Sequence, residues 1–143
     1  MYSGVVSLQA IRLICFAAEL NNLELVGTDI SNAYLEAYTG DPLVFTAGPE
    51  FGDLEGHTMV VVKALYGIPG SGHQWAERWA AILRAEGWEP CRADHDVWMK
   101  RNGNVYEYIG IYVDDLIIAS KNPDELLDVL VKVDLFFFCE NSY

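Results

Sequence analysis

Residues 105–120 read VYEYIGIYVDDLIIAS, and this stretch decides the fold that we predict. Its first half is rich in β-branched and aromatic residues, a composition that favours a strand. A second short apolar run follows at Leu116–Ala119, and Asp114 and Asp115 lie between the two runs. Aspartate is a poor strand residue and a good turn residue, so we predict a β-hairpin with two carboxylates at its tip.

The two carboxylates need a partner, because an ionised carboxylate is costly to remove from water unless it is paired or bound to a metal. Taken alone, the stretch favours the simpler interpretation of an ordinary Asp-Asp turn on a surface hairpin. The rest of the sequence therefore decides whether the pair belongs to a metal site.

The size and composition of the chain predict one packed domain. It has 143 residues, of which 52% are hydrophobic and 13% aromatic, enough for a sizeable core. We find no apolar run long enough to span a membrane, and no signal peptide. The three cysteines lack metal-ligand spacing, which predicts reduced thiols in an intracellular protein. The sequence leaves a cytoplasmic particle and the nucleus both open as its location.

The charge balance argues against strong binding to nucleic acid. The net charge is −12, whereas proteins that bind a phosphate backbone usually carry a basic patch. The nine cations are scattered, and only Lys100 and Arg101 are adjacent. We therefore expect weak nucleic-acid binding by this acidic chain.

Hydrophobic periodicity and turn residues predict the elements along the chain. Ser7–Leu20 has helical periodicity with Ser7 as N-cap, and Gly27 within the next strand suggests a close backbone approach. The predicted elements are a helix at Ser7–Leu20, a strand at Glu24–Ile30, a helical turn at Ser31–Glu36, strands at Leu43–Thr46 and Thr58–Lys63, a helix containing Trp75 and Trp79, a strand at Ala93–Lys100, the hairpin, and a helix at Pro123–Val133. This order predicts an α+β fold, an antiparallel sheet with helices packed on one face.

A third acid joins the argument, because Asp29 lies near the end of a predicted strand. A sheet can bring a strand end and a hairpin tip side by side, and three carboxylates gathered there would repel one another without a cation. Mg²⁺ takes oxygen ligands and commonly uses one or two carboxylates, leaving room for substrate phosphates. Two such ions about 3.5–4 Å apart would serve phosphoryl transfer.

Three motifs carry a resemblance to a known family. Tyr112–Asp115, followed by Leu-Ile-Ile-Ala, matches the YVDD box of reverse transcriptases. Asp29–Leu35 looks like their first catalytic motif, an aspartate followed five positions later by an aromatic residue. Leu65–Ile68 and then Gln74–Trp75 are similar to the "LYGL…QW" signature of copia-type retrotransposon polymerases. The order and spacing of the family are followed from residue 5 to residue 130, so the resemblance covers nearly the whole chain.

The resemblance implies a polymerase palm with a two-metal centre. Asp29 and Asp114 would be the direct metal ligands, together with the main-chain carbonyl of Ile30. Asp115 would be a supporting carboxylate. The implied cofactor is a pair of Mg²⁺ ions, for which Mn²⁺ could substitute.

The resemblance also implies residues that contact the nucleotide. Tyr34 would lie under the incoming sugar and exclude a 2′-hydroxyl, and Tyr66 and Gly67 would lie against nucleotide and template. For both tyrosines, a simple role as core aromatics remains an equal alternative. The implied partners are an RNA or DNA template with its primer and deoxynucleotides. The primer 3′-hydroxyl would attack the α-phosphate, and pyrophosphate would leave.

The chain also departs from the family. Residues 69–73 read PGSGH where the family usually has Lys-Gln-Ser-Pro-Arg, so two cations are missing. We expect a single palm-like domain over residues 1–143, without counterparts of the basic fingers segment, thumb and RNase H domain. Two functions remain open: the palm of an RNA-directed DNA polymerase within a retrotransposon polyprotein, or a catalytically inactive or domesticated remnant that acts as a binding or scaffold module. We expect the isolated chain to be weak or inactive as a polymerase.

Overall fold

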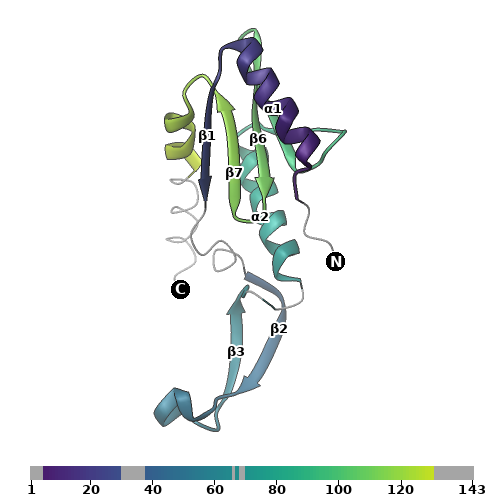
Figure 1. Cartoon of the computed structure of the whole chain (residues 1–143). Coiled ribbons are helices and arrows are strands. Elements are labelled where there is room, and N and C mark those ends of the chain that lie inside the picture. Colours follow the sequence, from purple (N-terminus) through teal and green to yellow (C-terminus); the bar gives the residue numbers. More distant parts are fainter. Residues whose placement is uncertain (1–4, 30–37, 66, 68–69, 131–143) are drawn as a thin grey trace. The chain divides into compact units, whose positions relative to one another are not determined.

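The computed structural model describes residues 5–29, 38–65, 67 and 70–130 (Figure 1). The chain divides into two compact units, which we call the hairpin unit (Met1–Ser3 and Asn32–Arg78) and the sheet unit (Gly4–Ser31 and Trp79–Tyr143). The sheet unit holds a five-stranded sheet in which every pairing is antiparallel. In spatial order its strands are β1 (Glu24–Asp29), β7 (Asp115–Ser120), β6 (Val105–Tyr112), β5 (Val97–Asn102) and β4 (Glu89–Pro90). The predicted α+β class and antiparallel sheet are confirmed.

The hairpin unit contains a separate two-stranded antiparallel sheet. Its strands are β2 (Tyr38–Thr46) and β3 (Thr58–Lys63). The connection between β2 and β3, predicted as a loop, contains the 3₁₀ segment η2 (Pro49–Leu54). The centre of the Phe51 ring in this segment lies 5.6 Å from the centre of the Phe45 ring in β2. Helix α2 (Ser71–Ala85) begins in this unit and ends in the sheet unit.

Helix α1 (Leu8–Asn21) begins and ends where the sequence predicts. The Ser7 hydroxyl accepts a hydrogen bond from the Ala10 N–H at 3.2 Å, which satisfies one of the free N–H groups of the first turn. At the other end Asn22 adopts a left-handed conformation with φ 54°, and asparagine tolerates this conformation better than most residues. The two caps therefore fix the length of α1.

Helix α1 packs on one face of the five-stranded sheet, and β6 carries a glycine at the closest approach. A Cβ atom on Gly110 would lie 2.8 Å from Ile117 Cγ2, 3.1 Å from Ile14 Cδ1 and 3.4 Å from Val6 Cγ2. A side chain at this position would therefore force Ile117 of β7 and Ile14 of α1 to shift. The sequence suggested such an approach at Gly27 instead, but a Cβ there would meet no atom within 4 Å. That expectation was wrong, because Gly27 lies in β1, where α1 leaves the sheet open.

The other face of the sheet carries two cation–π contacts. Val97 belongs to the core under α1, so the next residue of β5, Trp98, points to the opposite face. There the guanidinium of Arg84, from α2, lies 5.5 Å from the centre of the Trp98 ring. The Lys100 ammonium lies 6.0 Å from the Trp88 ring on the same face.

The last predicted helix is present over residues 123–130. The Leu126 N–H donates to the carbonyl of Asn122 at 3.2 Å, which places Asn122 at the start of the helix, as predicted. The predicted helical turn at Ser31–Glu36 lies outside the described residues. Within the parts of the chain that the structure describes, we find no helix with the length and hydrophobicity of a bilayer-spanning segment.

Candidate functional site

The sheet brings two of the three predicted acids together. Asp29, the last residue of β1, is the register partner of Asp115, the first residue of β7. Residues paired in this way have Cα atoms about 4.5–5.5 Å apart and side chains on the same face of the sheet. Both residues are exposed. Like charges directly opposite each other destabilise a sheet, so this pair gains from a cation.

The third acid lies in the adjoining turn. Tyr112 pairs with Asp115, which leaves Val113 and Asp114 as the two turn residues between β6 and β7. Asp114 is half-buried, and its Oδ1 atom is removed from solvent. The predicted hairpin is therefore present, with Asp114 at its tip and Asp115 one residue into the second strand.

The turn itself is strained. Val113 has φ +55°, a left-handed conformation that is unusual for a β-branched residue. Such a conformation costs about 1–3 kcal/mol and persists only where the surrounding structure enforces it. The two strands of the hairpin enforce it here, because their register leaves only two residues to reverse the chain. The position of Asp114 is thus set by a turn with little freedom.

Main-chain contacts from other segments hold the hairpin on its β6 side. Val5 forms an antiparallel bridge with Tyr112, and the Val6 N–H donates to the Ile111 carbonyl at 2.9 Å. The Ile111 N–H in turn donates to the carbonyl of Asp96 at 2.9 Å. The end of β6 that leads into the acidic turn is therefore anchored to two segments distant in sequence.

Two further acids near this end of β6 have structural roles. One oxygen of Asp94 accepts the Ser7 N–H at 3.0 Å, and the other accepts the Asp96 N–H at 3.1 Å. Burial raises the pKa of Asp94, but hydrogen bonds from Ser7 and Asp96 outweigh it, so that the pKa is lowered overall. Burial, followed by the charge of Asp94, raises the pKa of Asp96. The Asp94 carboxylate thus ties the start of α1 to the loop before β5.

Glu107, in the interior of β6, forms a buried hydrogen-bond network that our sequence analysis missed. It is 7% exposed, and its Oε1 atom accepts hydrogen bonds from Ser120 Oγ at 2.7 Å, the Lys121 N–H at 2.9 Å and Asn102 Nδ2 at 3.1 Å. Burial raises the pKa of Glu107, but these hydrogen bonds and the nearby charge of Lys100 lower it overall. The signal in the sequence was a lone acid inside an apolar strand. Its role is to join three segments at the end of the sheet remote from the acidic turn.

The donors at the acidic turn fit a hard divalent cation. Carboxylate oxygens are the ligands that Mg²⁺ prefers, and one or two of them suffice when water and phosphate complete the coordination. Asp29 and Asp115 supply a carboxylate pair, with Asp114 in the adjoining turn. Among the described residues, no three His, Cys, Asp or Glu side chains are grouped closely enough to hold a metal ion by themselves. Asp29, Asp114 and Asp115 all belong to the described residues, so they do not form a three-carboxylate cluster, and an ion bound by the Asp29–Asp115 pair would need further oxygen ligands from water or substrate.

Most of the residues predicted to contact the nucleotide belong to the part of the chain that the structure does not describe. Ile30, Tyr34 and Tyr66 lie outside the described residues. Gly67 lies in the hairpin unit, between β3 and α2, with φ +85°. Its left-handed conformation explains why glycine occurs there, and its predicted contact with nucleotide stays a prediction.

Comparison with known proteins identifies the class. The family model described as reverse transcriptase (RNA-dependent DNA polymerase) matches residues 1–138, and the chain belongs to this family. The chain corresponds to the reverse transcriptase domain of copia-type retrotransposon Pol polyproteins, as the relatives below indicate.

Three curated relatives illustrate the similarity. The chain is 31% identical over 136 residues to the transposon Ty1-BL Gag-Pol polyprotein of Saccharomyces cerevisiae, 27% over 139 residues to the retrovirus-related Pol polyprotein from transposon TNT 1-94 of Nicotiana tabacum, and 25% over 131 residues to that from transposon RE1 of Arabidopsis thaliana. These alignments cover 94%, 94% and 90% of this chain but 8%, 10% and 9% of the relatives. The chain thus spans about a tenth of the length of the curated relatives that it matches. No solved structure matches it significantly.

Proposed function

We propose that this chain is the palm domain of a retrotransposon RNA-directed DNA polymerase and carries its catalytic carboxylates. The observation that supports the proposal most directly is the register of the sheet, which sets Asp29 opposite Asp115 beside the turn that holds Asp114. The family match and the names of the relatives support the same assignment. The reaction would be transfer of a deoxynucleotide to the 3′-hydroxyl of a primer.

In this proposal the acids hold a pair of divalent ions, Mg²⁺ or Mn²⁺. Asp29 and Asp114 are the direct ligands, with the carbonyl of Ile30, and Asp115 is the supporting carboxylate. Bound ions of this kind stabilise the charge on the attacking and leaving oxygens of a phosphoryl transfer. The strained turn at Val113 would fix the direction of Asp114, because a two-residue connection leaves its backbone few alternatives.

The remaining assignments concern substrate. Tyr34 would contact the sugar of the incoming nucleotide, where a ring excludes a 2′-hydroxyl, and Tyr66 and Gly67 would face nucleotide and template. The partners would be a primed RNA or DNA template and deoxynucleotides, held with the help of other parts of a polyprotein. The lengths of the relatives support this last point, because the match covers about a tenth of each.

A second function has an observation in its favour. The chain carries a net charge of −12, which repels the phosphate backbone of a primer–template. A catalytically inactive or domesticated domain that serves as a binding or scaffold module would tolerate this charge. The two functions differ in whether the aspartates support chemistry.

Primer extension separates them. The purified chain is incubated with a primed RNA template, deoxynucleotides and Mg²⁺ or Mn²⁺, and the products are resolved on a sequencing gel. We expect weak synthesis that Asp114→Asn abolishes and that Asp53→Asn, the same charge change in the 3₁₀ segment, leaves intact. Synthesis that persists in Asp114→Asn would contradict the assignment of this aspartate. No synthesis by the wild-type chain, together with Mn²⁺ binding that Asp114→Asn does not weaken, would favour the scaffold function.

A further inference from the structure

Helix α1 has a second apolar side that is exposed among the residues that the structure describes. Its buried side, which includes Ala10, Ile14 and Ala18, faces the sheet. Leu13, Phe16 and Leu20 follow one another at steps of three and four residues, and they are 66%, 61% and 67% exposed. We call these three residues the α1 stripe. Side chains at such steps share one side of a helix, so the stripe is one continuous apolar strip.

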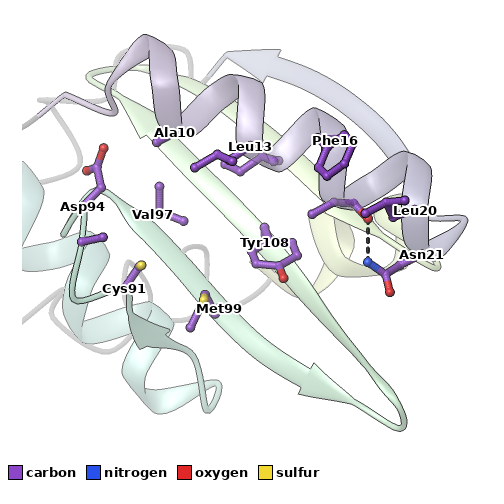
Figure 2. A pocket seen from close by; sticks show the side chains of 13 residues that line it. Ala10, Leu13, Phe16, Leu20, Asn21, Cys91, Asp94, Val97, Met99 and Tyr108 are labelled. Carbon is purple, nitrogen blue, oxygen red and sulfur yellow. Dashed lines mark hydrogen bonds between the residues drawn. The ribbon is translucent and has the colours of Figure 1, made fainter.

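The stripe forms one wall of a groove within the sheet unit. Figure 2 shows Leu13, Phe16 and Leu20 of α1 on one side and Val97, Met99 and Tyr108 of the sheet on the other. The groove has a volume of about 310 Å³. An exposed apolar strip next to an apolar groove is typical of an interaction surface, because its contact with water is unfavourable.

The charges beside the stripe indicate what could cover it. Arg12 and Glu19 are exposed, lie seven residues apart on α1, and do not line the groove. At 100° per residue they share the flank of the stripe opposite to Ala10 and Ala17, which do line it. One flank of the helix therefore carries one positive and one negative charge, and the other carries small side chains.

This pattern is complementary to itself. When two copies of a helix lie antiparallel across a two-fold axis, the same flank of each helix meets the other, and residues before the centre face residues after it. With Phe16 near the axis, Arg12 faces the partner's Glu19, and the partner's Arg12 faces Glu19. Leu13 then faces the partner's Leu20. Apolar contact and charge pairing thus agree in the same arrangement.

We propose that the α1 stripe is the interface of a homodimer, in which α1 of a second copy lies antiparallel along the stripe and the groove. The interface is isologous, so both copies bury the same surface. The flanking ion pairs select the antiparallel register, as charges beside an apolar seam do in paired helices.

The size of the surface sets the strength of the dimer. Thirteen residues line the groove, whereas a standard interface uses roughly 20–30 residues from each partner. The net charge of −12 on each copy adds long-range repulsion, which about 0.15 M salt screens beyond some 8 Å. We therefore expect a dissociation constant in the micromolar range, so that both species are populated at ordinary laboratory concentrations.

Sedimentation equilibrium of the whole chain tests the proposal at about 0.15 M salt and protein concentrations of roughly 5–500 µM, a range chosen to bracket a micromolar constant. The average mass should rise with concentration from the 16.0 kDa of the monomer toward twice that value. Phe16→Glu should remain monomeric throughout. Leu54→Glu is the matched control, because Leu54 is also an exposed leucine, at 46%, but lies in η2 and not in α1 or the groove, and this variant should dimerise as the wild type does.

Exchange of the flanking charges tests the register. Arg12→Glu and Glu19→Arg should each weaken the dimer at least about tenfold, because each places like charges opposite one another twice. The double variant that carries both changes again places opposite charges face to face. Its dissociation constant should lie within about threefold of the wild-type value. Circular dichroism confirms that each variant is folded. A wild-type chain that stays monomeric at the highest concentration would overturn the proposal, and so would a double variant no stronger than the single ones.

Discussion

Gly110 and Gly27 offer a matched pair of positions for testing how α1 packs. Both are register partners of Ile117, on opposite sides of β7, but only Gly110 lies under α1. Gly110→Ala should lower the free energy of unfolding by about 1–3 kcal/mol, because the added methyl group would overlap Ile117 and Ile14. Gly27→Ala should leave it unchanged or raise it by up to about 1 kcal/mol, because the methyl group meets open space and restricts the unfolded chain.

Urea unfolding followed by circular dichroism measures both changes. Equal effects of the two substitutions would show that α1 does not press on the sheet at Gly110. The two variants control for each other, because both replace glycine by alanine next to Ile117.

The buried carboxylate of Glu107 predicts a pH dependence of stability. Its folded-state pKa is lowered, so its contribution is complete above the ordinary glutamate value of 4.5 and is lost as the pH falls through the lowered folded value. Glu107→Gln should lower the free energy of unfolding at pH 7 by about 2 kcal/mol, because charge-assisted hydrogen bonds become neutral ones.

The measurement is urea unfolding at several values between pH 3 and pH 7, a range chosen around the ordinary glutamate pKa of about 4.3–4.5. The difference in the free energy of unfolding between wild type and Glu107→Gln should be constant above that pKa and should become smaller below it. A gap that is the same at every pH would mean that the charge on Glu107 contributes nothing to stability. Exposed Glu24, at the start of β1, supplies a control, because Glu24→Gln should show no such gap.

At the scale of elements, the acidic hairpin combines a strained turn with well-paired strands. Val113→Gly removes the penalty for a positive φ, while glycine makes the unfolded chain more flexible. We expect the free energy of unfolding to rise by up to about 1 kcal/mol, because the relief of strain exceeds the entropic cost. Thermal and urea unfolding measure the change. A loss of more than about 1 kcal/mol would indicate that packing of the half-buried Val113 side chain, and not strain, dominates at the turn.

The helices and strands also show how much of the fold could be predicted from the sequence. Helix α1 and the β6–β7 hairpin were predictable because Ser7, Asn22 and the acidic pair are local signals of caps and turns. The strand predicted at Ala93–Lys100 begins only at Val97, because the Asp94 side chain accepts the Asp96 N–H and holds the preceding residues in a turn. No composition rule reveals such a contact.

For the candidate site, the sequence supplied the identities of the acids but not their register. That Asp29 faces Asp115 depends on how β1 pairs with β7, a contact between segments more than 80 residues apart. The close approach was assigned to Gly27 and not to Gly110, because both are single glycines in apolar strands and only tertiary packing distinguishes them. The network around Glu107 was missed for the same reason.

At the scale of the whole molecule, charge should limit contact with nucleic acid. With a net charge of −12, the chain should bind a labelled RNA–DNA duplex with a dissociation constant above about 10 µM in fluorescence anisotropy at low salt, because non-specific affinity depends on neutralising phosphates. Millimolar Mg²⁺ should strengthen the binding by bridging acids and phosphates. Submicromolar affinity without Mg²⁺ would show that a local basic surface outweighs the net charge.

The central claim is that the sheet gathers aspartates into a divalent metal site, and binding of Mn²⁺ tests it most directly. Electron paramagnetic resonance measures the free Mn²⁺ that remains as the chain is added. We expect Asp29→Asn and Asp114→Asn each to weaken the tightest binding at least about tenfold, because each removes a carboxylate ligand. Asp53→Asn, an exposed acid in η2, should leave that binding unchanged. If Asp29→Asn and Asp114→Asn bind Mn²⁺ no more weakly than Asp53→Asn does, the aspartates do not form a metal site.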